Sequence, residues 1–224
     1  MSPNERSSAH GPADDDAVLS ALEAERLDLC DRLGQLGPAD WSTPSLCGNW
    51  TVHDVAAHLA LATRESAWDF VTGMIRSLGN FDRMTAQNAQ RHAERYPPGA
   101  IIDQLRATAG SAHTTFGSSP RDCLIDVVVH TQDMARPLGL DWATPPERTV
   151  IALDHALASR WYGAKQRLAD LALTATDTSW TGGAGSSSVH GPAIDLLLVA
   201  TGRPSGLDRL DGPGIRSLQE SFAA

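Results

Sequence analysis

Apolar residues recur at helical spacing through most of the first two thirds of the chain. The first stripe is followed by Gly37 and Pro38, where a helix would end. It consists of Val18, Leu22, Leu29, Leu33 and Leu36. The spacing predicts an amphipathic helix that packs in a helical bundle.

Three more helical segments follow. Thr51 and Asp54 form a capping-box pattern at the start of a predicted helix over 51–71. Two further segments, 81–96 and 100–116, are separated by the sequence YPPG, which breaks a helix. The chain up to this point therefore reads as helical throughout.

The run LIDVVV before His130 is ambiguous, because β-branched residues favour strands. Its neighbours are helical, however, and polar residues recur at 126, 130 and 133, close to the helical period. We predict a helix here that ends near Pro137.

Beyond residue 146 the pattern changes. Pro146 is placed to open a helix that runs on to residue 169. LALTATD, the glycine-rich SWTGGAG and SSSVHG are typical of two strands joined by a turn, and Pro192 opens an apolar helix that ends at Gly202. The tail after this helix carries no clear pattern.

These patterns predict a mainly α protein with a small α+β part. We expect a disordered tail at residues 1–15, where Ser, Pro, Gly and Asp dominate without periodicity. A helical bundle at 16–142 and a smaller C-terminal α+β domain at 146–224 would follow.

Composition narrows the possible partners. The chain has 18 basic and 27 acidic residues, a formal charge of -9 and a pI near 5.2, so nucleic acid and anionic membrane surfaces are not expected to bind it. No apolar run approaches the roughly 18 to 20 residues of a membrane span, and the N-terminus lacks a secretory pattern. The three cysteines include no CxxC pair, which fits a cytoplasmic protein.

The candidate chemistry begins with Asp126 and His130. Residues four apart on a helix project to one side, so the carboxylate and the imidazole share one patch of space. A charge within an apolar run needs a partner or a cation. The pair is a possible metal clamp, and a simple salt bridge between the two side chains is the alternative.

His58 is the best candidate for a third ligand, because it shares an apolar stripe with Val55 and Ala62 on its own predicted helix. A set of two histidines and one carboxylate leaves a coordination position open, as in catalytic zinc sites, and it also describes non-haem Fe(II) sites. Asp133 lies one turn beyond His130 and would orient that ring, or would simply be solvated. A lone core histidine without any metal is the alternative for His58.

Six sequence features occur in a fixed order along the chain: Trp41, SLCGNWTVHDVAAHLA, DVVVHTQDMARPLG, TDTSW, a glycine turn and VHGPAIDLLLVATGR. Together they resemble the mycothiol-dependent maleylpyruvate isomerase family, whose N-terminal domain is a DinB-like four-helix bundle. The resemblance implies that His58, Asp126 and His130 are the metal ligands. The family usually has Glu where this chain has Asp126, which is shorter by one methylene.

The resemblance also implies an activity. A divalent metal, with zinc as first choice, would activate mycothiol as cosubstrate for addition to an electrophile, in an isomerase or an S-transferase. An unsaturated dicarboxylate is the implied substrate, and Arg203 its expected partner; the alternative for Arg203 is a helix cap. The competing functions are a non-catalytic module that binds metal or a small ligand, and a metal hydrolase that needs no thiol. A monomer and a homodimer are both compatible with the sequence.

Overall fold

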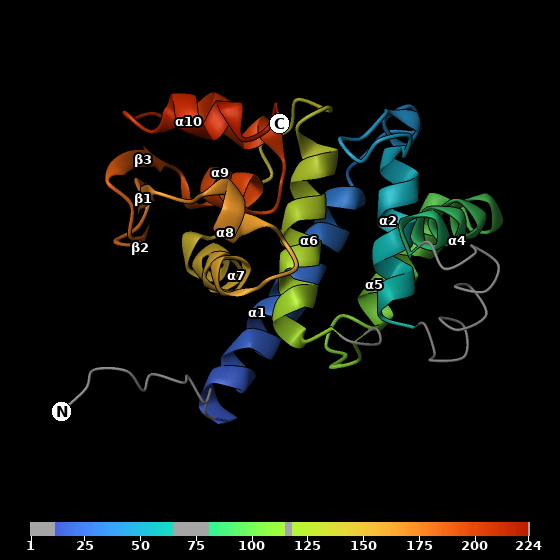
Figure 1. The fold of residues 1–224 in the computed structure, drawn as a ribbon. Helices are drawn as coiled ribbons and strands as arrows, with labels where there is room; N and C mark the ends of the chain where they lie inside the picture. Colours follow the sequence, from blue (N-terminus) through green and yellow to red (C-terminus); the bar gives the residue numbers. More distant parts are fainter. Residues whose placement is uncertain (1–11, 65–80, 115–117, 224) are drawn as a thin grey trace.

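The structure is a computed structural model, and it describes residues 12–64, 81–114 and 118–223 (Figure 1). The described residues are mainly helical with one small sheet, which confirms the predicted fold class. The helices of the first part are α1 (Pro12–Leu33), α2 (Val52–Ala62), α4 (Phe81–Arg95), α5 (Pro98–Ala107) and α6 (Pro120–Ala135). The predicted tail up to residue 11 and the predicted helix beyond residue 64 lie outside the described residues.

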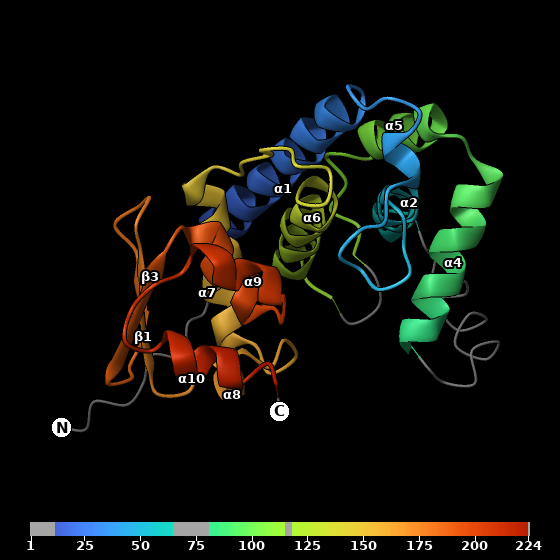
Figure 2. The same cartoon turned by 90° about the horizontal axis from the view of Figure 1, so that it is seen from above.

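Helix α6 is the centre of the molecule. It lies between α2 and the later helix α7 (Pro146–Ala158) in both views (Figures 1 and 2). It also packs against α1, while α2 packs against α4 and α5. Its fully buried residues include Leu124, Val128 and Met134. Helix α6 therefore contacts both parts of the fold.

Capping boxes fix where the two site-bearing helices begin. At α2 the Thr51 side chain accepts a hydrogen bond from the Asp54 backbone while Asp54 accepts from the Thr51 backbone, as predicted. Helix α6 begins with the same arrangement between Ser119 and Asp122, with Pro120 at its first position. The LIDVVV run is helical, so the prediction of a helix over a strand is confirmed.

Helix α1 starts earlier than the sequence led us to expect. Residues 12 to 15 were predicted in the disordered tail, but the helix begins at Pro12. Proline suits a first helical position, and Asp14 and Asp15 in the first turn interact favourably with the helix dipole. Pro and Asp are also common in loops, so composition alone placed residues 12–15 in the tail.

The predicted helix from Pro146 to residue 169 is two helices. Helix α7 ends at Ala158, where Ser159 is extended, and the short α8 (Ala164–Arg167) follows. Gly163 has a φ of 70°, a left-handed conformation that stops a helix. The intervening loop carries Tyr162 toward α6.

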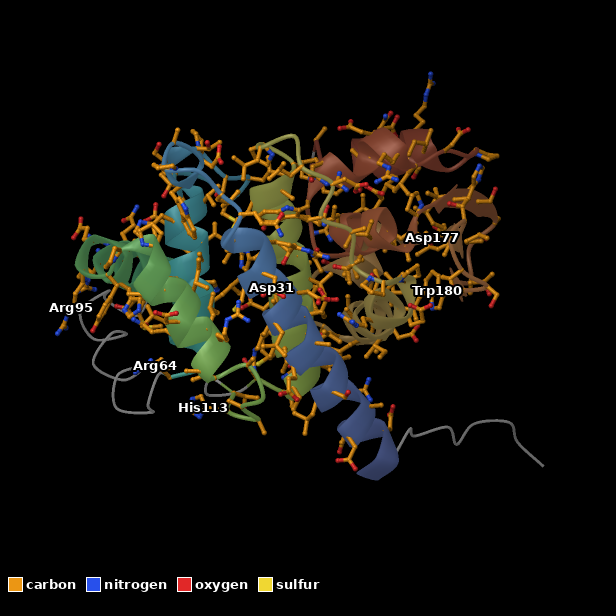
Figure 3. All side chains as sticks on the ribbon, turned by 180° about the vertical axis from the view of Figure 1, so that it is seen from behind. Asp31, Arg64, Arg95, His113, Asp177 and Trp180 are labelled. Carbon is orange, nitrogen blue, oxygen red and sulfur yellow. The ribbon has the colours of Figure 1, made fainter. Side chains whose placement is uncertain are left out.

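The sheet has three strands, not two. Strand β1 (Leu171–Ala175) lies between β2 (Thr181–Gly183) and β3 (Ser187–Gly191), antiparallel to β2 and parallel to β3. The glycine-rich stretch that was predicted as a turn therefore supplies an edge strand. Asp177 and Trp180, labelled in Figure 3, hold the β1–β2 turn in place: Asp177 accepts from the Ala193 backbone, and Trp180 donates to Asp154 of α7, both at 2.9 Å.

Helix α9 (Ala193–Ala200) is apolar, as predicted, and packs against α7 and the sheet. Beyond it, a 3-10 helix (Pro204–Arg209) and α10 (Ile215–Glu220) complete the chain. The sequence indicated no structure for this last stretch. Among the described residues, no helix combines the length and apolar character that a membrane span requires.

Candidate metal centre

The three predicted ligands meet where α2 faces α6. His58 Nε2 lies 3.4 Å from one carboxylate oxygen of Asp126, and His130 Nε2 lies 3.3 Å from the other. One ligand atom from each residue lies within 4.8 Å of the others. The structure thus brings together the residues that the sequence analysis grouped, and their role as ligands stays a prediction.

The donor set has the chemistry and spacing that a divalent ion needs. Zinc binds imidazole nitrogen and carboxylate oxygen at about 2.0 to 2.2 Å, so neighbouring donors of a tetrahedral site lie roughly 3.4 Å apart. The two nitrogen–oxygen separations, 3.4 and 3.3 Å, are of this size, and each involves a different oxygen of Asp126. Among the described residues, no arginine or lysine forms an ion pair with Asp126, so the carboxylate is not already neutralised by a permanent cation.

The second edge of the His130 ring is held by Asp133. Nδ1 of His130 lies 3.0 Å from Oδ2 of Asp133, a side chain that is fully buried. A carboxylate at Nδ1 favours the tautomer that carries its proton there, which leaves the Nε2 lone pair facing Asp126 and His58. The predicted contact between Asp133 and the ring is present. Solvation, the alternative for Asp133, is wrong.

Two further residues converge on the same oxygen of Asp133. The thiol of Cys47 donates to Oδ2 at 3.0 Å and lies 3.3 Å from Nδ1 of His130. Arg203 contributes Nη2 at 3.3 Å and also donates to the Thr201 carbonyl at 3.0 Å. Arg203 therefore combines a helix-end contact with an ion pair to the residue that holds His130.

The loop before α2 brings Cys47 and Trp50 to His130. The Ser45 backbone donates to the Trp50 carbonyl at 2.8 Å, and the Leu46 backbone donates to the Asp133 carbonyl at 3.0 Å. Trp50 stacks on His130 with ring centroids 6.3 Å apart, and lies 5.3 Å from the His58 ring. The loop is thereby tied to α6 at the ring of His130.

Two cavities meet at His130 and Trp50. The smaller, of about 300 Å³, has all three predicted ligands in its wall. The larger, of about 720 Å³, is lined by Cys47 and Arg203 on the other side. Of the predicted site residues, Arg203 thus faces a different cavity from Asp126 and His58.

The electrostatics favour a positive charge between the two helices. Burial alone would raise the pKa of Asp126, but the adjacent imidazoles of His58 and His130 lower it. Burial disfavours charge on His130, yet Asp126 and the hydrogen bonds of the ring raise its pKa well above 6.5. A bound metal ion would supply positive charge in the same place.

A second cluster stands one helical turn away in the wall of the smaller cavity. Asp122 accepts hydrogen bonds from Nε2 of His155 at 2.9 Å and from the Tyr162 hydroxyl at 2.8 Å. Burial would raise the pKa of Asp122, but these bonds and the contacts with Ser119 lower it. Asp122 and Tyr162 both line the smaller cavity, so residues from the C-terminal part close its wall.

The sequence analysis assigned no role to Trp50, Asp122 or Tyr162. Trp50 directly precedes the capping box of α2, so its position beside the site was readable from the spacing to His58. The pattern of Ser119, Pro120 and Asp122 signalled the start of α6. Tyr162 falls inside the predicted continuous helix, and the loop at 159–163 between α7 and α8 is what brings it to the cavity.

Comparisons with known proteins agree on one family. Residues 21–145 match the family model described as the mycothiol maleylpyruvate isomerase N-terminal domain. A crystal structure of the mycothiol-dependent maleylpyruvate isomerase superposes with a TM-score of 0.55 at 16% identity, covering 88% of this chain and 92% of that one. A histidine-to-alanine mutant of such an enzyme gives 0.53 at 14% identity, with the same coverage. These structural matches establish a shared fold. No curated protein sequence matches significantly.

Proposed function

The chain belongs to the mycothiol maleylpyruvate isomerase family, and we propose that it is a metal-dependent enzyme that activates mycothiol for addition to an electrophilic small molecule. The proposal includes a cytoplasmic location, because all three cysteines are free and a low-molecular-weight thiol stays reduced there. A monomer or a homodimer is compatible with it.

One observation carries the proposal. His58, Asp126 and His130 form a spaced donor set in the wall of a cavity, and Asp133 holds the ring of His130 from behind. Three protein ligands beside open space are the arrangement of catalytic rather than structural metal sites. A purely structural ion pair would not need a cavity at its ligand atoms.

Each residue of the site has its own role in this proposal. A divalent metal, preferably zinc, would supply Lewis acidity that lowers the pKa of a bound thiol. His58, Asp126 and His130 would hold that ion, and Asp133 would fix the tautomer and orientation of His130. Trp50 packs against both imidazoles from the loop before α2.

The thiol chemistry allows two outcomes. Addition to a C=C bond of an unsaturated acid, rotation about the resulting single bond and departure of the thiol would isomerise the substrate. Retention of the new C–S bond would make the protein an S-transferase. The binding of a dicarboxylate by Arg203 stays a prediction, and Arg203 lines the larger cavity.

The test combines metal content with thiol consumption. Protein purified without chelator or affinity metal is measured by mass spectrometry, and loss of mycothiol is followed with an electrophile present. We expect about one equivalent of metal in the wild type. His58→Ala should lose both metal and thiol consumption. His53→Ala is the matched control, because His53 lies on the same helix and contacts the Tyr96 carbonyl instead.

Each other outcome points to a competing function. Metal without any turnover would favour a non-catalytic binding module, and turnover without thiol would favour a hydrolase that uses a bound water. Absence of metal from the wild type would make the three residues an internal ion pair and would refute the proposal.

A further inference from the structure

The smaller cavity, which contains the predicted metal ligands, exposes more apolar than polar surface. Its lining also includes three neutral polar side chains, Thr85, Asn88 and Ser118. Its apolar lining comes from α2, α4 and α6: Leu61, Ala62, Met84 and Cys123. Trp50 adds an aromatic face. At about 300 Å³ the cavity is at the small end of the range for ligand pockets. Its size suits a small molecule with an apolar body.

Both oxygens of the Asp122 carboxylate in this wall already accept hydrogen bonds from the protein. One oxygen of Asp122 accepts from His155 and Tyr162, and the other accepts from the Ser119 hydroxyl at 2.6 Å and its backbone at 2.8 Å. The Tyr162 hydroxyl donates its proton to Asp122 and is not a donor for a substrate carboxylate. Of the two carboxylates in the wall, Asp122 would repel an anion, whereas the charge of Asp126 would be matched by the metal.

The nearby cations face elsewhere. Arg203 lines the larger cavity and is bound to Asp133. Arg26 is 4% exposed and lines a separate, very small cavity with Cys123 and Asp126. Its guanidinium donates to the carbonyls of Ala109 and Ser111 at 3.0 and 2.8 Å. Arg64 lies at the exposed end of α2 (Figure 3). Among the described residues, no arginine or lysine lines the smaller cavity.

A bound metal would not supply the missing attraction. The charge of a divalent ion would be balanced by the carboxylate of Asp126 together with the thiolate of the cosubstrate. A dicarboxylate in this cavity would thus lose its hydration without gaining a cationic partner from the described residues. A neutral molecule avoids that loss and gains from contact with the apolar wall.

We propose that the electrophile of this chain is a small, neutral and largely apolar molecule, not the dicarboxylate dianion implied by the family resemblance. The inference rests on the proposed function, since it names the substrate class of the same site. In the reaction, the thiol adds across an activated C=C bond: the S–H and π bonds break, and C–S and C–H bonds form. No oxidant or reductant is needed.

The test compares a neutral and an anionic form of one electrophile. Dimethyl maleate and maleate are each incubated with mycothiol, with and without the metal-loaded protein. The rate with protein is divided by the rate with mycothiol alone, which removes the difference in intrinsic reactivity. We expect the enhancement to be at least about tenfold greater for the diester, because like charges oppose the dianion. An equal or greater enhancement for maleate would overturn the inference.

A charge introduced into the wall sharpens the test. Leu61 is half-buried and lines the cavity, so Leu61→Arg places a cation there. This variant should shift the preference toward maleate by about tenfold, whereas Leu61→Met should leave it unchanged. If Leu61→Arg folds, binds metal and leaves the preference unchanged, charge does not select the substrate and the inference is wrong.

Binding of unreactive analogues separates this inference from the proposed function. Dimethyl succinate and succinate have no C=C bond, and Trp50 in the wall provides a fluorescence signal, with Trp50→Phe as the control. Tighter binding of the diester supports the inference even where neither maleate reacts, in which case only the proposed thiol chemistry fails. Tighter binding of succinate overturns it.

Discussion

Two carboxylates have different partners: Asp126 on α6 and Asp195 on α9. Asp195 of α9 is fully buried and pairs with Arg136 at the end of α6 at 2.5 Å. Arg209 approaches its other oxygen to 3.7 Å. Asp126 is 34% exposed in its side chain and meets two imidazoles at a cavity wall.

Their pKa shifts run in opposite directions. Burial raises the pKa of Asp195 and outweighs the lowering by Arg136. At Asp126 the two imidazoles outweigh burial and lower the pKa. A guanidinium is charged at every accessible pH, so Asp195 is a fixed link between the two parts of the fold. Imidazoles exchange a proton for a metal, so the same carboxylate chemistry at Asp126 is suited to a binding site.

The largest effect is expected on metal affinity at Asp126, the carboxylate of the candidate site. Asp126→Asn removes the charged ligand, and metal affinity should fall by more than about 100-fold, because even the loss of an outer contact costs 10- to 100-fold. Asp126→Glu is the matched variant, since it keeps the charge and restores the usual family residue. Equilibrium dialysis against zinc measures both. Unchanged affinity in Asp126→Asn would remove Asp126 from the ligand set.

The second-largest effect is expected on stability, at the buried ion pair between Arg136 and Asp195. Arg136→Met leaves Asp195 buried without its guanidinium, and the free energy of unfolding should fall by about 3 to 5 kcal/mol. Metal content of the folded protein should stay unchanged. Denaturant unfolding measures the loss, and the double variant Arg136→Met/Asp195→Leu should recover much of it. A loss within about 1 kcal/mol for the single variant would contradict the assigned role.

A smaller effect is expected one contact away from the site. Asp133→Asn removes the charged partner of Nδ1 of His130, and zinc affinity should fall by about 10- to 100-fold. Cys47→Ala is the control, because it removes a contact to the same oxygen but leaves the carboxylate of Asp133 in place. If the two variants lose affinity equally, the carboxylate does not orient the ring.

The smallest expected effect concerns pH. Hydrogen bonds from His155, Ser119 and Tyr162 lower the pKa of Asp122 below 3.8, so the folded state binds fewer protons there than the unfolded state. The stabilisation is complete above pH 3.8 and is lost as the pH falls toward the lowered value, by about 1 to 2 kcal/mol. Asp195 has a raised pKa and contributes the opposite slope.

Unfolding midpoints between pH 3 and pH 7 test this sign. The loss of stability on acidification should be smaller in Asp122→Asn than in the wild type. The same loss in both proteins would show that Asp122 is not the group responsible.

The helices of the first part and their capping at Thr51 were readable because periodicity and caps are local properties. The break after Ala158 was not, because the apolar spacing continues through it, whereas the backbone is extended at Ser159 and left-handed at Gly163. The edge strand β2 was also missed, since glycine-rich segments carry no strand preference and β2 is held by its pairing with β1.

At the candidate site, too, some features follow from the local sequence and others only from tertiary packing. The sequence determined that Asp126 and His130 share one face of a helix, because a spacing of four residues fixes that geometry wherever the helix lies. Tertiary packing alone decided that His58 faces them, that Cys47 and Arg203 meet Asp133, and that Arg203 lines a different cavity from Asp126. These contacts join residues 68 or more positions apart, and no local pattern encodes how distant segments pack.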